Sequence, residues 1–458
     1  LYNEVPDIWC ERVFMPDTDM EELMRQNGIK LFGLESRDSI DTFDFIGFTM
    51  QYELSYTAAL NMLDLAGLPL RSLERDSSHP IVIAGGPCVS NPEPIADFFD
   101  LFVLGEGEEV SLELFELYRR HKAAGFDRDK FLTEAAKIEG VYVPSLYEIS
   151  YKDDGTIASV TPVNGAPAKV RKRIIEDLDR VYYPDRFVVP FIDIVHDRGM
   201  SEIFRGCVRG CRFCQAGFIY RPVREKSPEV IDAQSRALCE NTGYEEFSLS
   251  SLSTSDYSQL ETLLPRLLDW AEKQKTNISL PSLRVDGFSE ELAARLNILR
   301  RSGLTFAPEA GTQRLRDAIN KNLTEDEILS TARKAFSAGW TSVKLYFMSG
   351  LPTETMEDIE GIANLSQKIV DSFYKNPDKP KGKGVNGSVS VSCFVPKPFT
   401  PFQWEPQDTM EMLQEKQKHL RDSVKTKKIS LKWHDAATSF LEGVFARGDR
   451  RLCDVLEE

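Results

Sequence analysis

Short apolar runs alternate with stretches of helical spacing along the first 140 residues. The runs read FDFIGFTM, PIVIAGG and FDLFVLG, and helical spacing follows in YTAALNMLDLAGL and EEVSLELFELYRRHKAAG. Strands that alternate with helices are typical of a parallel sheet with helices on both faces. The pattern therefore predicts an α/β domain of the Rossmann-like (flavodoxin-like) class over residues 1–140, with ligands beyond the carboxyl ends of its strands.

The pattern loosens over residues 141–196 and then resumes. The segment VYVPSLYEISYKDDGTIASVTP predicts a β-hairpin around Asp154 and Gly155, within a linker. A second alternation over 197–405 predicts a partial (β/α)6 TIM-type barrel, whose site gathers at the strand ends. A C-terminal helical extension is expected over 406–458. The six strands expected in the barrel are Ser201–Gly206, Glu246–Ser251, Ile278–Arg284, Leu304–Ala307, Ser342–Met348 and Ser388–Phe394.

Composition and charge narrow the class of protein. Of 458 residues, 41% are hydrophobic and 28% charged, which is ordinary for a soluble globular chain. No segment approaches the ~20 apolar residues of a membrane span, and no signal peptide is evident. The net charge of −16 argues against a broad phosphate-binding surface, although a local basic cleft stays open. The chain begins without Met, which is compatible with a fragment.

Three of the eight cysteines cluster in IFRGCVRGCRFCQAGF, with the spacing C-x3-C-x2-C. The other five are scattered singly, so no disulfide framework is expected and a cytoplasmic location is predicted. Cys207, Cys211 and Cys214 follow the first expected barrel strand, and three thiolates on one loop suit a [4Fe–4S] cluster. Glycines in the loop allow close wrapping, and its arginines, Arg205, Arg209 and Arg212, are expected to offset the cluster's negative charge. A zinc site or three unrelated thiols are the alternatives, but no second cysteine pair is present.

This loop resembles the signature of the radical S-adenosylmethionine (SAM) superfamily, C-x3-C-x-aromatic-C, with Phe213 in the aromatic position. The resemblance implies that the fourth iron binds the amino and carboxylate groups of SAM. It also implies that an electron from the cluster cleaves SAM to methionine and a 5′-deoxyadenosyl radical. An external electron donor of the flavodoxin or ferredoxin type is the partner that follows.

The same resemblance suggests SAM contacts at the ends of later strands. SLSSLSTSD stands where the family often carries Gly-Gly-Glu, so hydroxyls of Ser250 and Ser251 or backbone carbonyls must serve. Arg284 lies on the third strand, and Glu309 lies in FAPEAGTQRLRDAINK, which resembles an E-x-G-[ST] element. Gln313 opens the following helix. There are alternatives to these SAM-binding roles: Arg284 could form an ordinary ion pair, and Glu309 could cap a helix. FMSGLPTET resembles a fifth-strand G-x-P-x-E-T element.

The N-terminal half resembles a cobalamin-binding domain. Together with HDRGMSEIFRGC and LEGVFARGDRRL, it resembles a family of radical SAM proteins with such a domain, over nearly the whole chain. None of the five histidines stands in an Asp-x-His-x-x-Gly motif that would ligate cobalt. A domain that keeps the fold and binds nothing is the alternative. The residues expected to hold the corrin and its tail are Gln51, Tyr52, Ser55, Gly85, Gly86, Gly105, Glu106 and Gly107.

Three functions follow from these patterns. The first is a radical SAM enzyme in which cobalamin assists methylation or rearrangement. The second is a cobalamin-independent, methylthiotransferase-like modification of RNA or protein. Methylthiotransferases usually carry three further cysteines in their N-terminal domain, whereas only Cys10 and Cys88 precede the linker here, which counts against a second cluster. The third is a non-catalytic iron–sulfur or RNA-recognising protein. The sequence assigns no catalytic residue and no substrate, leaves nucleic acid open as a partner, and indicates no membrane contact.

Overall fold

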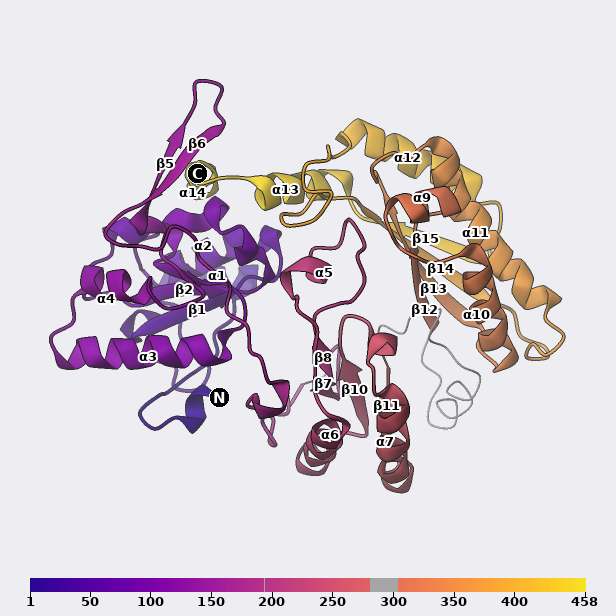
Figure 1. Ribbon diagram of the computed structural model, residues 1–458, viewed down its shortest axis with the longest axis horizontal. Helices are drawn as coiled ribbons and strands as arrows, with labels where there is room; N and C mark the ends of the chain where they lie inside the picture. Colours follow the sequence, from indigo (N-terminus) through magenta and orange to yellow (C-terminus); the bar gives the residue numbers. More distant parts are fainter. Residues whose placement is uncertain (193, 281–303) are drawn as a thin grey trace. The chain divides into compact units, whose positions relative to one another are not determined.

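The computed structural model describes residues 1–192, 194–280 and 304–458 (Figure 1). The chain forms two compact units, each of which mixes helices with parallel strands. Unit 1 comprises Leu1–Glu176 together with Val444–Glu458, and unit 2 comprises Asp177–Gly443. The first unit is therefore built from both ends of the chain.

Unit 1 contains a four-stranded sheet with the order β1-β2-β3-β4. The first three strands run parallel and β4 is antiparallel to β3. Its strands are β1 (Phe45–Thr49), β2 (Ile81–Gly85), β3 (Leu101–Val103) and β4 (Val141–Tyr142). Its helices are α1 (Thr18–Asn27), α2 (Tyr56–Leu65), α3 (Gly107–Ala123), α4 (Arg128–Ala135) and α14 (Leu452–Glu457). The predicted apolar runs thus form the parallel strands of the sheet, in which β2 and β3 are mostly buried and the edge strand β1 keeps two exposed residues.

The predicted hairpin is confirmed. Strands β5 (Tyr147–Tyr151) and β6 (Ile157–Pro162) pair antiparallel, and Gly155 adopts a left-handed φ of 79° in the turn. Figure 1 shows the hairpin projecting from the rest of unit 1.

The C-terminal segment is part of the unit 1 core. Phe445 is buried among the core residues of this unit, 5.9 Å from the ring of Tyr56. Arg450 is an anchor for the segment, because its guanidinium donates to the Glu93 carboxylate at 3.0 Å and to the Tyr142 hydroxyl at 3.0 Å. The segment expected to be a helical extension therefore ends inside the first unit.

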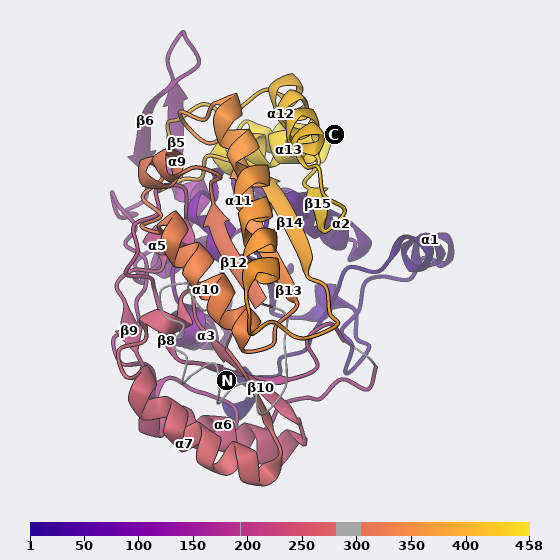
Figure 2. The same cartoon turned by 90° about the vertical axis from the view of Figure 1, so that its right-hand side faces the viewer.

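Unit 2 contains two parallel sheets, ordered β11-β10-β7 and β12-β13-β14-β15. Their strands are β7 (Gly199–Glu202), β10 (Glu246–Ser250), β11 (Asn277–Ser279), β12 (Leu304–Glu309), β13 (Ser342–Ser349), β14 (Asn386–Cys393) and β15 (Ile429–Trp433). The helices are α5 (Ala216–Ile219), α6 (Pro228–Thr242), α7 (Leu260–Gln274), α9 (Gln313–Ala318), α10 (Glu325–Ser337), α11 (Met356–Lys375), α12 (Met410–Ser423) and α13 (Ala436–Arg447), which runs on into unit 1. Helices α10 and α11 lie side by side over the β12–β14 sheet (Figure 2).

Local sequence explains where these helices begin. Ser227 caps α6 by accepting a hydrogen bond from the Val230 N–H, and Pro228 occupies the first turn. Thr324 and Glu327 form a capping box at the start of α10. In the part of the chain that the structure describes, no helix combines the length and apolar character needed to cross a membrane.

Three predicted elements differ from the structure or lie beyond its description. The strand expected over Ser201–Gly206 is interrupted, because β7 ends at Glu202 and β8 (Phe204–Arg205) turns to pair antiparallel with β9 (Arg224–Glu225). Strand β15 lies within the segment expected to be helical. Most of the third predicted barrel strand, after residue 280, lies outside the described residues.

Candidate functional site

The three clustered cysteines lie on the loop between β8 and α5. All three are partly exposed. The backbone N–H of Arg209 donates to the Cys207 sulfur at 3.4 Å. Burial raises the pKa of the Cys214 thiol; the Gly217 N–H and the Lys321 ammonium oppose that rise, while the other two thiols add to it.

This donor set suits an iron–sulfur cluster. Each cysteine of such a cluster binds a different iron, and N–H groups directed at the sulfurs tune it. Backbone N–H groups point at two of the three sulfurs, and the thiols lie close enough to act on one another electrostatically. Among the described residues, no three His, Cys, Asp or Glu side chains are gathered around the position of a single metal ion, and a cluster would instead offer each cysteine a separate iron.

Asp256 fastens one side of the cysteine loop. Its carboxylate accepts two hydrogen bonds from the Arg209 guanidinium, one of them at 2.9 Å, and a third from the Ser253 hydroxyl at 2.7 Å. The Asp256 side chain is 11% exposed. Asp256 stands at the end of SLSSLSTSD, where the sequence predicted SAM contacts but gave no sign of an ion pair to the cysteine loop.

The turn that closes α9 holds the next residues of the loop. The Arg212 N–H donates to the Ile319 carbonyl at 3.0 Å, and the Arg212 guanidinium donates to the Ala318 carbonyl at 2.6 Å. The Asn320 side chain donates to the Gly210 carbonyl at 2.8 Å. Residues more than 100 positions away in the chain thus hold the loop.

The proline-rich segment after β14 also reaches this loop. The Phe402 N–H donates to the Arg212 carbonyl at 3.2 Å, and the Gln215 side chain donates to the Pro398 carbonyl at 3.3 Å. Arg205 is paired with Glu202 at 2.9 Å. Two of the three arginines expected to offset a cluster charge, Arg205 and Arg209, are therefore ion-paired with carboxylates.

Some of the residues predicted to bind SAM belong to the segments that contact the cysteine loop. Phe213 packs against the apolar cluster that includes Leu315 and Phe394. Ser250 is the last residue of β10, and the Ser251 hydroxyl lies 3.0 Å from that of Thr254. The predicted contact Arg284 lies outside the described residues.

Glu309 ends β12 in a left-handed conformation, with φ 65°, beside a register shift in the pairing with β13. Such a backbone costs a non-glycine residue about 1–3 kcal/mol and persists only when its surroundings hold it. The Glu309 carboxylate lies 3.1 Å from the Lys321 ammonium, with the two side chains 16% and 12% exposed. Gln313 accepts hydrogen bonds from Arg316 and from the Glu325 N–H.

The glycine of the E-x-G-T element has a packing role. A Cβ at Gly311 would lie 2.3 Å from the Ile362 nitrogen and 2.4 Å from the Asp358 carbonyl oxygen, both backbone atoms of α11. The Thr312 hydroxyl and the Arg314 guanidinium both donate to the buried Asp358 carboxylate. This element therefore fixes α9, and with it the turn that reaches the cysteine loop.

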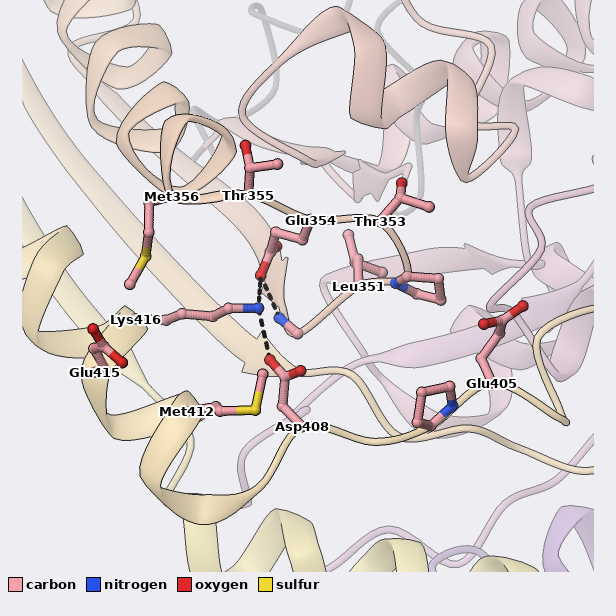
Figure 3. A pocket seen from close by; sticks show the side chains of 13 residues that line it. Leu351, Thr353, Glu354, Thr355, Met356, Glu405, Asp408, Met412, Glu415 and Lys416 are labelled. Carbon is pink, nitrogen blue, oxygen red and sulfur yellow. Dashed lines mark hydrogen bonds and ion pairs between the residues drawn. The ribbon is translucent and has the colours of Figure 1, made fainter.

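A pocket of about 420 Å³ lies beside the loop that follows β13 (Figure 3). Figure 3 shows Lys416 of α12 reaching between Glu354 and Asp408, at 2.8 and 2.6 Å. The Gly350 N–H also donates to Glu354 at 2.7 Å, and burial raises the pKa of this carboxyl. Glu354 is the glutamate of the G-x-P-x-E-T element, and its contacts here bind the loop to α12.

In unit 1, two of the three predicted corrin-contact loops lie against one another. The Met50 N–H donates to the Gly85 carbonyl at 2.7 Å, and the Met50 carbonyl accepts from the Cys88 N–H at 3.1 Å. Gln51, Tyr52 and Ser55 follow β1 directly, and the Ser55 hydroxyl donates to the Tyr52 carbonyl. These loops meet at the carboxyl edge of the sheet.

The third loop is covered by a later part of unit 1. Gly105 has φ 99°, and a Cβ there would lie 2.2 Å from the Arg173 carbonyl oxygen. The Glu106 carboxylate accepts from the Ile175 N–H at 2.6 Å, and Gly107 begins α3. A Cβ at Gly86 would similarly meet the Met50 carbonyl at 2.7 Å. The chain's own backbone therefore accounts for glycine at both 86 and 105, independently of any corrin.

Comparison with known proteins assigns the chain to a class. Residues 1–144 match the family model for radical SAM proteins, N-terminal, and residues 201–366 match that for the radical SAM superfamily. The chain therefore belongs to the radical SAM superfamily, and membership implies a [4Fe–4S] cluster and SAM as cofactors. The protein MJ0966 of Methanocaldococcus jannaschii is 31% identical over 434 residues, which cover 94% of this chain and 84% of that protein.

Two solved structures share the fold at low identity. The methyltransferase TsrM of Kitasatospora setae, with tryptophan and a SAM analogue bound, aligns with a TM-score of 0.53 and 14% identity over 87% of this chain and 68% of its own. The cobalamin-dependent enzyme OxsB, with aqua-cobalamin and SAM bound, aligns with a TM-score of 0.52 and 13% identity, over 88% and 57% of the two chains. Both alignments extend well beyond the length of unit 2 alone.

Proposed function

We propose that this radical SAM enzyme binds its cluster through Cys207, Cys211 and Cys214 and binds cobalamin in unit 1. Cobalamin would assist the methylation or rearrangement of a substrate whose identity is open. The observation that carries the cluster assignment is the cysteine loop, in which backbone N–H groups point at two of the sulfurs and long-range contacts hold the backbone between the cysteines.

The chain's own residues prepare this site. Three thiolates leave one iron of a four-iron cluster open, and a bound cluster supplies the electron that cleaves SAM to methionine and a 5′-deoxyadenosyl radical. Asp256 and Asn320 hold the loop at the adjacent residues Arg209 and Gly210. Ser250, Ser251 and Glu309, with Gln313 and Arg284, remain the proposed contacts to SAM.

We infer the finer architecture from strand order. All strands of the two main sheets in unit 2 run parallel, and within each sheet the strands are ordered as they occur in the chain. This arrangement supports a partial TIM-type barrel in which β7, β10 and β11 continue into β12, β13 and β14. The three parallel strands of unit 1 support a Rossmann-like domain.

Support for cobalamin comes from unit 1 and from the fold comparisons. The loops after β1 and β2 meet at the carboxyl edge of the sheet, the place where α/β domains bind ligands. TsrM and OxsB, which have the same fold, were both solved with cobalamin. No histidine in this chain stands in the Asp-x-His-x-x-Gly motif, so any bound cobalamin has no histidine ligand from that motif.

Anaerobic reconstitution tests the cluster and the radical reaction. We expect about four irons per chain, a reduced-cluster EPR signal, and 5′-deoxyadenosine from SAM after reduction with dithionite, consistent with three-cysteine ligation of a four-iron cluster. Replacing Cys207, Cys211 and Cys214 together by alanine should abolish all three signals. The isolated, exposed Cys10→Ala is the matched control. An intact cluster that produces no 5′-deoxyadenosine would refute the radical reaction.

Cobalamin binding is tested separately. The protein is incubated with hydroxocobalamin, passed through a desalting column, and examined by absorption spectroscopy. Retention at about one equivalent supports the proposal for unit 1, because a built site binds in stoichiometric amounts. Absence of retained cobalamin, in a preparation that still cleaves SAM, would refute the cobalamin proposal and leave the radical reaction standing.

A further inference from the structure

The turn that closes α9 touches both the cysteine loop and Glu309. We propose that Lys321, the last residue of this turn, is a positioning residue that holds the Glu309 carboxylate for contact with SAM. The inference rests on the proposed SAM site and deepens it, since nothing in the sequence motif marks Lys321.

The turn is firmly attached to the cluster side of the site. Ala318 and Ile319 accept hydrogen bonds from Arg212, at 2.6 and 3.0 Å, and Asn320 donates to Gly210 at 2.8 Å. The Lys321 backbone N–H donates to the Arg316 carbonyl at 2.9 Å. The backbone that carries the Lys321 side chain is therefore fixed relative to the cysteines.

The side chain of Lys321 reaches from this fixed base to Glu309. Its ammonium lies 3.1 Å from the carboxylate, and both side chains are largely buried, at 12% and 16% exposed. A carboxylate at the end of a strand in a left-handed backbone conformation needs support from its surroundings. The Lys321 ammonium places a compact positive charge at one Glu309 oxygen, which orients the carboxylate.

Substitution of Lys321 separates this role from simple packing. Lys321→Met keeps most of the length of the side chain and removes the charge. Loss of a residue that orients a ligand-binding group typically costs about 10- to 100-fold in affinity, so we expect SAM binding to weaken by about that factor. Lys321→Arg should restore most of the affinity. Lys334→Met, at an exposed position on α10, is the matched control.

A double-substitution cycle tests whether Lys321 acts through Glu309. SAM affinity is measured by equilibrium dialysis on reconstituted protein, together with iron content and the change that SAM causes in the EPR signal. Glu309→Gln alone should weaken binding, and adding Lys321→Met to it should weaken binding by less than about threefold more, because coupled residues are not additive.

Each outcome decides a different point. Unchanged SAM affinity in Lys321→Met, or full additivity with Glu309→Gln, overturns the inference. Loss of iron in Lys321→Met also overturns it, because Lys321 would then support the cluster and not Glu309. A wild-type protein that holds its cluster but does not bind SAM overturns the proposed function itself, and this inference with it.

Discussion

Replacing Gly311 by alanine tests how closely the segment before α9 must approach α11. The new methyl group would lie 2.3 Å from the Ile362 nitrogen, 2.4 Å from the Asp358 carbonyl oxygen and 2.5 Å from the Gly361 carbonyl carbon. All three are backbone atoms of one helix, so no side-chain rotation relieves the contact. Since heavy atoms prefer separations near 3.5 Å, the helix and the segment must move apart by about 1 Å.

The free-energy cost follows from that displacement. Overpacking of a close-packed contact costs about 1–3 kcal/mol, and occasionally more. The same movement strains the hydrogen bonds that Thr312 and Arg314 donate to the buried Asp358 carboxylate, and bonds to a charged group contribute about 1.5–3 kcal/mol each. We therefore expect the free energy of unfolding to fall by ~3–5 kcal/mol.

Equilibrium unfolding in guanidinium chloride, followed by tryptophan fluorescence, measures this change. Four of the five tryptophans belong to unit 2, so the signal reports mainly on that unit. Gly384→Ala is the control in the same unit, because a Cβ there meets only side-chain tips at 3.6 and 3.7 Å. The four tryptophans are Trp270, Trp340, Trp404 and Trp433.

A second readout connects the packing to the site. The end of α9 holds the cysteine loop, so Gly311→Ala should also lose iron to a chelator faster than Gly384→Ala does. Equal unfolding midpoints for the two variants would refute the argument that the close approach of Gly311 to α11 is essential.

Three further substitutions test the polar contacts. Lys416→Met leaves Glu354 and Asp408 without their shared cation, which should cost ~3–5 kcal/mol at pH 7. Because burial raises the pKa of Glu354, that loss should shrink as the pH falls from 7 to 5 and the carboxyl gains its proton. Arg450→Met should destabilise unit 1 by ~2–3 kcal/mol, seen as earlier proteolysis of the C-terminal segment, because Glu93 and backbone carbonyls lose their donor. Asp256→Asn should release iron to a chelator about tenfold faster, since the cysteine loop loses its ion pair.

Ion pairs made by exposed side chains provide matched controls for these three variants. Lys368→Met, Arg451→Met and Asp269→Asn each remove a charged group that is itself exposed, and ion pairs of such groups contribute about 1 kcal/mol or less. A variant that behaves like its control contradicts the role given to the buried residue. A stability loss in Lys416→Met that grows toward pH 5 would contradict the charge argument even if the protein is destabilised.

Prediction from sequence succeeded where the signal is local. The alternation of apolar runs and helical spacing identified most of the parallel strands of both units but missed β15, and Asp154 with Gly155 marked the turn of the hairpin. Failure came at the break after Glu202, where two residues turn out of the parallel sheet to pair with β9. The segment SEIFRG has only two apolar residues, Ile203 and Phe204, so its pattern does not distinguish a continuous strand from a broken one.

The sequence by itself determined the chemistry class, because three cysteines within eight residues and their spacing are properties of one short loop. It also determined the order of strands and helices, which depends on local periodicity. Only the tertiary structure decided what holds the loop. Asp256 and Asn320 lie 47 and 110 residues from their partners in the loop, and such pairings cannot be inferred from the spacing of hydrophobic residues. The same holds for Gly86 and Gly105. Neither position has room for a Cβ, because folding brings the backbone of another segment against it.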